Sequence, residues 1–241
     1  MRLSVTGTWP GTLVLRRGWA RADARPWNAE VPEAQLRLVR GGGQFLAGCT
    51  RHLLSSGAPA VISPPLTEGA ERPWRTVGFR DFLILELFRR QLGPVAPPPH
   101  PVTIASRDDW GKALQIDRAA FRGVWRLDGR GLAEALDATP RSVLLLAGRA
   151  GKPAGFAVVG SSGTSSYLQR VAVHPRHQQS GLGRALLREA MRWARRRGAQ
   201  SMILNTQPGN RPAAALYRAE GFTRLSERLV VLRRSEGEER D

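Results

Sequence analysis

The stretch that most constrains this chain is a short apolar strand that runs into a glycine-containing loop and then into a basic amphipathic helix. Residues 167–173 read YLQRVAV, residues 174–183 read HPRHQQSGLG, and residues 184–198 read RALLREAMRWARRRG. The first amides of a helix lack partners and carry the positive end of its dipole, so such a loop suits a phosphate or diphosphate. Gly181 and Gly183 would let that ligand approach the main chain closely.

The spacing of this loop excludes two common phosphate sites. A Walker loop requires a lysine and a Ser or Thr after its last glycine, where this chain has Arg184 and Ala185. A Rossmann fingerprint requires a third glycine, where Leu186 stands. The pattern Gln178-x-x-Gly181-x-Gly183 after a Val-Ala-Val strand resembles the acetyl-CoA loop of the GNAT superfamily of N-acetyltransferases. The alternative is a glycine-rich turn before an ordinary surface helix.

A second pattern follows at a distance typical of the same superfamily. Residues 201–205 (SMILN) read as a buried strand, and residues 210–222 fit N-x-x-A-x-x-L-Y-x-x-x-G-F. Asn210 suits a helix N-cap, Pro212 an early helical position, and Gly221 the left-handed residue that ends a helix. This pattern resembles the second conserved block of the GNAT superfamily. The resemblance covers about residues 102–234.

The resemblance implies an α/β (α+β) fold with the order β-α-α-β-β-β-α-β-α-β-β. That fold is a mixed, largely antiparallel twisted sheet with helices on both faces. The other segments agree, with expected helices at 108–121 and 128–138, and strands at 102–105, 142–147, 154–159 and 228–232. Periodicity alone predicts only an α/β or α+β class.

The N-terminal part echoes the second half of the chain. Residues 94–101 (PVAPPPHP) predict a stiff linker, and before them PWRTVGF at 73–79 matches LYRAEGF at 216–222. Chance similarity is the alternative. We expect residues 1–93 to form a degenerate, non-catalytic domain, a smaller α/β partial repeat in which Leu38 and Trp74 replace Gln178 and Tyr217. Residues 102–234 would form the catalytic domain and 235–241 a charged, disordered tail.

The resemblance implies acetyl-CoA as co-substrate and no metal. Backbone amides of residues 179–184 would hold the diphosphate, and the strand before them would pair with the pantetheine arm. The residues expected at the cofactor are Val171, Ala172, Val173, Gln178, Gln179, Ser180, Gly181, Leu182, Gly183, Arg184, Asn205 and Asn210.

Tyr217 is the expected general acid, because a phenol with a pKa near 10 is protonated at pH 7 and can donate to a departing thiolate. The alternative is a core tyrosine. In ribosomal-protein alanine N-acetyltransferases a glutamate stands five residues before the asparagine equivalent to Asn210. Asn205 holds that position here, and Gln169 also stands where some relatives carry a glutamate.

No direct base is therefore visible, and a water relay or the substrate itself must remove the proton. Asp128 and Glu134 are remote candidates. Neutralising a lysine at pH 7 costs about 4.6 kcal/mol and an α-amine about 1.4 kcal/mol. We therefore expect a protein or peptide α-amine, or a small-molecule amine of low pKa, as acceptor.

Composition sets the remaining expectations. The chain has 241 residues, a net charge of +17, one cysteine (Cys49), no signal-peptide pattern and no long apolar run. His174 and His177 lack neighbouring ligands, so we assign no metal. We expect a cytoplasmic enzyme without membrane attachment or specific nucleic-acid recognition, and a homodimer is compatible with the sequence. The alternatives are a CoA-binding pseudoenzyme and a ribosome- or RNA-associated protein that uses its arginines.

Overall fold

The computed structural model describes residues 2–149 and 151–235, and the chain divides into two compact units. Unit 1 comprises Met1–Leu85 and Glu227–Asp241, and unit 2 comprises Glu86–Ser226. Of the expected disordered tail, residues 236–241 lie outside the described residues.

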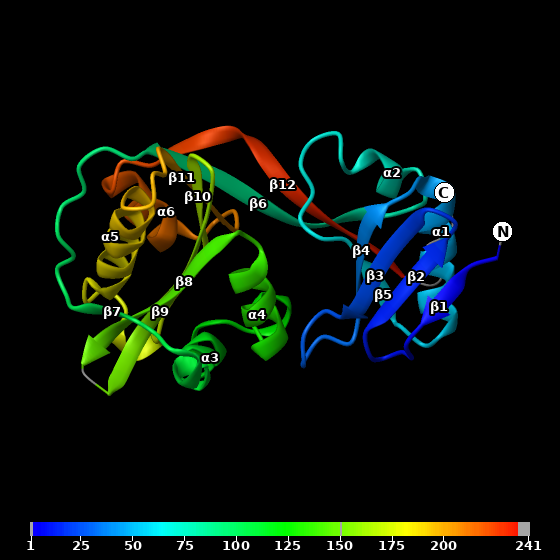
Figure 1. Ribbon diagram of the computed structural model, residues 1–241, viewed down its shortest axis with the longest axis horizontal. Helices are drawn as coiled ribbons and strands as arrows, with labels where there is room; N and C mark the ends of the chain where they lie inside the picture. The colour runs from blue at the N-terminus through cyan, green and yellow to red at the C-terminus, as the bar shows by residue number, and fades with distance from the viewer. Residues whose placement is uncertain (1, 150, 236–241) are drawn as a thin grey trace. The chain divides into compact units, whose positions relative to one another are not determined.

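Unit 2 is built on one mixed sheet (Figure 1). Its strands are β6 (Arg80–Gln91, from residue 86), β7 (Val102–Ile104), β8 (Arg141–Arg149), β9 (Lys152–Ser162), β10 (Ser165–Val173) and β11 (Ser201–Thr206). The order is β6-β11-β10-β9-β8-β7, and β10 and β11 are the parallel pair among otherwise antiparallel neighbours. The helices are α3 (Trp110–Ala120), α4 (Gly129–Asp137), α5 (Leu182–Arg195) and α6 (Arg211–Ala219). One-turn 3₁₀ helices lie at η1 (Arg107–Asp109), η2 (Gly123–Trp125) and η3 (Pro175–His177).

Alternating side chains divide the sheet of unit 2 into two cores. Leu144 and Leu146 of β8 pack with Ile116 of α3, whereas Leu145 packs with Leu186 of α5. The period-2 alternation of a strand produces this division. Figure 1 accordingly shows α3 and α4 on one face of the sheet, and α5 and α6 on the other. The expected largely antiparallel sheet with helices on both faces is confirmed.

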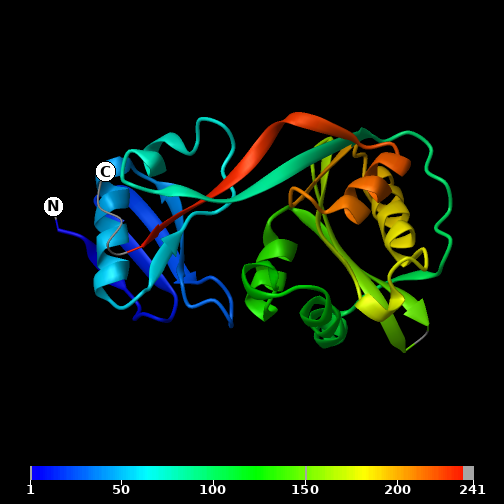
Figure 2. The same cartoon turned by 180° about the vertical axis from the view of Figure 1, so that it is seen from behind.

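Unit 1 repeats part of this arrangement. It contains β1 (Ser4–Thr6), β2 (Leu13–Arg17), β3 (Ala20–Pro26), β4 (Ala34–Arg40), α1 (Gly43–Ser55), β5 (Ala60–Ile62) and α2 (Arg72–Arg75). Its strand β4 runs parallel to β5 and is joined to it through α1, as β10 is joined to β11 through α5. The view from behind (Figure 2) shows α1 lying against the strands of this unit. The smaller partial repeat is thus present.

The last strand of each repeat is paired in the other unit. Strand β6 and strand β12 (Thr223–Ser235) follow the matched residues Phe79 and Phe222, so they are equivalents. In unit 2, residues 86–91 of β6 pair with β11. In unit 1, residues 233–235 of β12 pair with β5. This reciprocal exchange places the unit boundaries at 85/86 and 226/227, rather than at 94–101 as predicted from composition.

Two other expectations differ from the structure. The implied order ends in two strands, whereas the described residues form the single long strand β12. The proline-rich segment 94–101 is not a spacer between units, because it lies within unit 2. Val95 is buried in the α5 core, and Arg188 donates to the carbonyl of Pro97 at 3.2 Å. Residues 94–101, which form no helix or strand, thus pack against α5.

The exchanged strand β6 carries a testable part of the unit 2 core. Phe88 is fully buried and packs against Tyr217 with ring centroids 5.7 Å apart. Phe88→Ala is expected to lower the free energy of unfolding by about 3–5 kcal/mol because it leaves a cavity. Urea unfolding measures this loss. Ile104→Ala, at a residue 67% exposed on β7, is the control and should change stability by less than about 0.5 kcal/mol. An unaffected Phe88→Ala variant would show that β6 is not part of this core.

Candidate active site

The loop between β10 and α5 has a backbone that few sequences adopt. Gly181, the N-cap of α5, has φ +88°, and Gln179 has φ +61° although it carries a side chain. Left-handed backbone at a residue other than glycine costs about 1–3 kcal/mol. Hydrogen bonds hold the turn, since Ser180 Oγ donates to the carbonyl of His177 at 2.6 Å and Gln178 Nε2 to that of Val173 at 3.2 Å.

This geometry leaves a row of amides available to a ligand. The first main-chain bond of α5 runs from the Ala185 amide to the carbonyl of Gly181 at 2.9 Å. Over the described chain, we find no main-chain carbonyl that accepts from the amides of residues 179–184. Unpaired amides at a helix N-terminus suit an anion. His100 contacts the same loop, with Nε2 2.7 Å from the Ser180 carbonyl oxygen.

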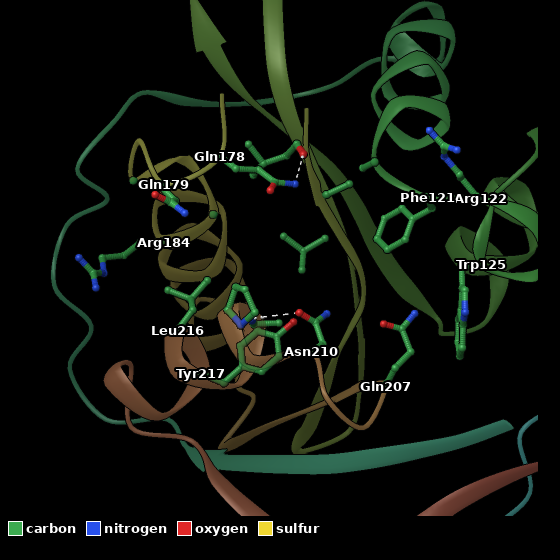
Figure 3. Close-up of a pocket in the computed structure, with 18 residues that line it drawn as sticks. Phe121, Arg122, Trp125, Gln178, Gln179, Arg184, Gln207, Asn210, Leu216 and Tyr217 are labelled. Atoms are coloured by element: carbon green, nitrogen blue, oxygen red, sulfur yellow. Dashed lines mark hydrogen bonds between the residues drawn. The ribbon is translucent and has the colours of Figure 1, made fainter. Parts of the chain in front are cut away.

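Beside this loop lies a cavity of about 820 Å³ (Figure 3). It is lined by Ala120, Phe121, Arg122, Trp125, Val171, Ala172, Val173, Gln178, Gln179, Gly181, Gly183, Arg184, Gln207, Asn210, Pro212, Ala213, Leu216 and Tyr217. Figure 3 shows Gln179 and Arg184 on one side of the cavity and Phe121, Arg122 and Trp125 on the other, with Tyr217 between them.

Most of the residues expected at the cofactor meet at this cavity. Those that line it are Val171, Ala172, Val173, Gln178, Gln179, Gly181, Gly183, Arg184 and Asn210. Ser180 and Leu182 do not, because their side chains line a separate cavity behind the loop. Asn205 does not reach it either, since it sits opposite Leu87 in the β11–β6 pair.

The polar side chains of Arg184 and Asn210 already have partners within the chain. Arg184 Nε forms an ion pair with Glu220 at 3.0 Å, and Glu220 also binds Arg188. Asn210 is the N-cap of α6 as expected, accepting from the Ala213 amide at 3.3 Å, and its Nδ2 donates to Thr206 at 3.0 Å. Main-chain amides, rather than these side chains, are therefore the free anion-binding groups of the site.

Tyr217 lies at the cavity wall with only 3% of its surface exposed. Its ring packs against Phe88 and Phe222, with centroids 5.7 and 6.1 Å away. Burial raises the pKa of Tyr217 to about 12. The phenol is therefore neutral, and a hydrogen-bond donor, throughout the physiological range.

None of the residues lining the cavity is a carboxylate. Asp128 caps α4 by accepting from the Gly131 amide at 2.7 Å, and neither Asp128 nor Glu134 reaches the cavity. Gln169 also points elsewhere, because a Cβ on Gly160 would lie 2.4 Å from its Nε2 and 2.3 Å from Thr139 Oγ1. Within the described residues, no carboxylate lies in the cavity beside Tyr217 as a direct base.

The cavity wall opposite the loop was not identified from the sequence. Phe121, Arg122 and Trp125 follow α3, and Gln207 follows β11. The signal that could have indicated this wall is a pair of aromatic residues at the end of an expected helix and in the segment after it, Phe121 and Trp125. Without the fold, nothing distinguishes them from ordinary core residues.

A buried ion pair holds this wall in place. Arg170 Nη2 lies 2.6 Å from Asp117 Oδ2, donates to the Trp125 carbonyl at 2.5 Å, and stacks its guanidinium 3.8 Å from the Phe121 ring centroid. Asp117 also accepts from the Leu127 amide at 2.7 Å. Burial raises the pKa of Asp117 and lowers that of Arg170, and each charge opposes its partner's shift. Each side chain therefore keeps its charge in this buried position because the partner carries the opposite charge.

Two other kinds of site, a metal centre and a membrane-spanning helix, are not found among the described residues. Within residues 2–149 and 151–235 we find no group of three or more His, Cys, Asp and Glu side chains arranged to hold a metal ion. No helix in that part of the chain is long and apolar enough to cross a membrane.

Comparison with known proteins identifies relatives of both the site and the fold. The family model described as "Acetyltransferase (GNAT) family" matches residues 110–222. A streptothricin acetyltransferase of Streptomyces lavendulae is 39% identical over 97 residues, which are 39% of this chain and 51% of that protein. The chain thus spans about half the length of this relative.

Two further likenesses extend over most of the chain. A mycothiol acetyltransferase of a Nocardioides strain is 30% identical over 244 aligned residues, covering 86% of this chain and 81% of that protein. A solved tandem GNAT protein from the clavulanic acid biosynthesis pathway superposes with a TM-score of 0.67 at 15% identity, over 95% of this chain and 83% of that one. The latter supports the fold alone.

Gly181 provides a test of the loop. In Gly181→Ala the new Cβ would sit at φ +88° and 3.0 Å from His100 Nε2, so the turn must shift. We expect CoA to bind about tenfold more weakly in calorimetric titration, through loss of charge-assisted hydrogen bonds. Gly198→Ala, at φ +84° with open space around it, carries the same backbone strain and should leave CoA affinity unchanged. Equal affinities of the two variants would contradict this assignment.

The contribution of the buried Asp117–Arg170 ion pair to stability can be tested by substitution. Arg170→Leu leaves Asp117 buried without its counter-charge and is expected to lower the free energy of unfolding by about 3–5 kcal/mol. The double variant Asp117→Asn/Arg170→Leu removes both charges and keeps an oxygen for the Leu127 amide, so it should recover part of this loss in urea unfolding. A double variant that is no more stable than Arg170→Leu would show that the two charges do not stabilise each other.

Proposed function

Because the chain belongs to the GNAT family of acetyltransferases, we propose that it transfers an acetyl group from acetyl-CoA to a primary amine by direct attack in a ternary complex. The observation that supports this most is the joining of two features in one cavity. Gln179, Gly181, Gly183 and Arg184, whose amides have no main-chain partner among the described residues, lie at one end, and the buried Tyr217 lies further in.

The residues of the cavity fit acetyl-CoA. The amides of residues 179–184 would hold its diphosphate, and Val171–Val173 of β10 would lie along the pantetheine arm. The bulge of β10 between Leu168 and Arg170 interrupts its ladder with β9 just before this segment. When bound, acetyl-CoA supplies an activated acetyl group as a thioester.

The role proposed for Tyr217 is to donate its Oη–H to the sulfur as the thiolate departs. A pKa of about 12 keeps that proton in place at neutral pH. A thiolate in the same buried environment is also desolvated, which raises its own proton affinity and favours the donation. The bond from nitrogen to the acetyl carbon forms as the carbon–sulfur bond breaks, and the thiol leaves with the proton of Tyr217. The proton that the amine loses is returned to the tyrosinate through solvent, so the transfer balances.

Proton removal from the acceptor is assigned to water or to the substrate itself, because no carboxylate lines the cavity. This favours amines that are partly neutral at pH 7, of which an α-amine is the commonest in proteins and peptides. We therefore propose a peptide or small-molecule α-amine as acceptor, ahead of a lysine side chain.

Tyr217→Phe tests the proposed acid. The variant keeps the packing against Phe88 and Phe222, so the fold and CoA affinity should be unchanged, whereas kcat should fall about 100-fold. Steady-state kinetics with acetyl-CoA and an α-amine peptide measure this.

The pH profile gives an independent readout. Since Tyr217 keeps its proton until about pH 12, kcat of the unaltered chain should rise with amine deprotonation and then stay level to about pH 11. A Tyr217→Phe variant within a few-fold of the unaltered chain would remove Tyr217 from the mechanism. Binding of CoA without turnover of any amine would identify a pseudoenzyme.

A further inference from the structure

The acceptor end of the cavity has an unusual charge balance for an enzyme that must receive an amine. Its wall is lined by Arg122, Phe121 and Trp125, with Arg122 at the outer edge, and none of the lining residues is Asp or Glu (Figure 3). In neutral solution most amines are protonated, so a site that binds the ammonium form would be expected to offer carboxylates. This end of the cavity offers the opposite charge.

Two buried carboxylates that are linked to the cavity wall already have partners in the chain. Asp117 is fully buried and binds Arg170 and the Leu127 amide. Glu220, 7% exposed, binds Arg184 and Arg188. Neither is free to meet a second cation, and neither lines the cavity.

Arg122 differs from the arginines of those pairs. It is exposed, it lies directly after α3, and no carboxylate of the described chain forms an ion pair with it. The segment that carries it is fixed, because Arg170 binds the Trp125 carbonyl and stacks on the Phe121 ring. The structure thus holds an unpaired guanidinium at the rim of an apolar, aromatic pocket.

We propose that the acceptor is an apolar or aromatic α-amine that carries a carboxylate, with Arg122 as the counter-charge of that carboxylate, and that polycationic amines are disfavoured. The inference rests on the proposed acetyl transfer and narrows its substrate class. Phe121 and Trp125 provide contact area for the apolar group, and a guanidinium provides the planar donors that suit a carboxylate.

The same arrangement helps to explain how the chain works without a base. An ammonium that enters an apolar cavity beside Arg122 loses hydration and meets a like charge, and both effects favour its neutral form. The amine therefore reaches the thioester unprotonated, and its proton is left in solvent. The acceptor's own carboxylate then offsets the charge of Arg122.

Acceptor amines that differ in charge distinguish the proposed preference for a carboxylate from acetyl transfer in general. The full chain is assayed with acetyl-CoA and with phenylalanylglycylglycine as the free acid, the same tripeptide as its carboxamide, and spermidine. The two tripeptides share their α-amine and aromatic group and differ in the terminal charge. We expect kcat/KM to be about two- to fivefold higher for the acid than for the amide, as an exposed ion pair gives, and lowest for spermidine.

Two arginine variants test the assignment to Arg122. Arg122→Gln should bring the acid-to-amide ratio to about one, mainly by lowering kcat/KM for the acid. Arg118→Gln, one helical turn earlier on α3, exposed and outside the cavity lining, should keep the ratio of the unaltered chain.

The outcomes that contradict the inference are distinct from those that contradict the proposed function. Faster turnover of the amide or of spermidine, or an acid-to-amide ratio that Arg122→Gln leaves intact, would overturn the inference and leave acetyl transfer standing. CoA binding without acetylation of any of the three amines would overturn the proposed function itself.

Discussion

The structure of the candidate site depends on one turn of backbone. Gln179 and Gly181 adopt left-handed angles, so the chain reverses between β10 and α5 and leaves the amides of residues 179–184 without a main-chain partner in the described part of the chain. A regular turn would pair those amides within the chain and close the anion site. The strain at Gln179 is a local cost that the hydrogen bonds of Ser180 and Gln178 offset. The direction of α5, and with it the position of the cavity, follows from this turn.

The exchange of β6 and β12 affects the unit that carries this turn. Strand β11, which precedes the helix with Tyr217, is flanked in its sheet by β10 and by β6 from the first repeat. Phe88 of β6 contributes directly to the packing of Tyr217. The degenerate repeat therefore has a structural task that does not require catalytic residues. Trp74 of α2 stands where α6 carries Tyr217, which is consistent with that task. The expected match of Leu38 with Gln178 is wrong, because Leu38 lies within β4 whereas Gln178 lies in the loop after β10.

The sequence predicted those features that short-range chemistry dictates. The phosphate loop, the Asn210 cap and the left-handed Gly221 each depend on residues within one or two turns, and all are present as expected. The acceptor wall was not predicted, because Trp125 is positioned by Arg170, which lies 45 residues away in the chain. The strand exchange was also missed. Both equivalents have equally good strand sequences, and only tertiary pairing decides which partner each one takes.

The central claim is that main-chain amides at the start of α5 bind a diphosphate. Calorimetric titration of the full chain with CoA and with pantetheine, which lacks the diphosphate, tests it most directly. CoA is expected to bind at least about tenfold more tightly than pantetheine, and the difference should shrink as the salt concentration rises. Equal affinities for the two ligands at low salt would contradict it.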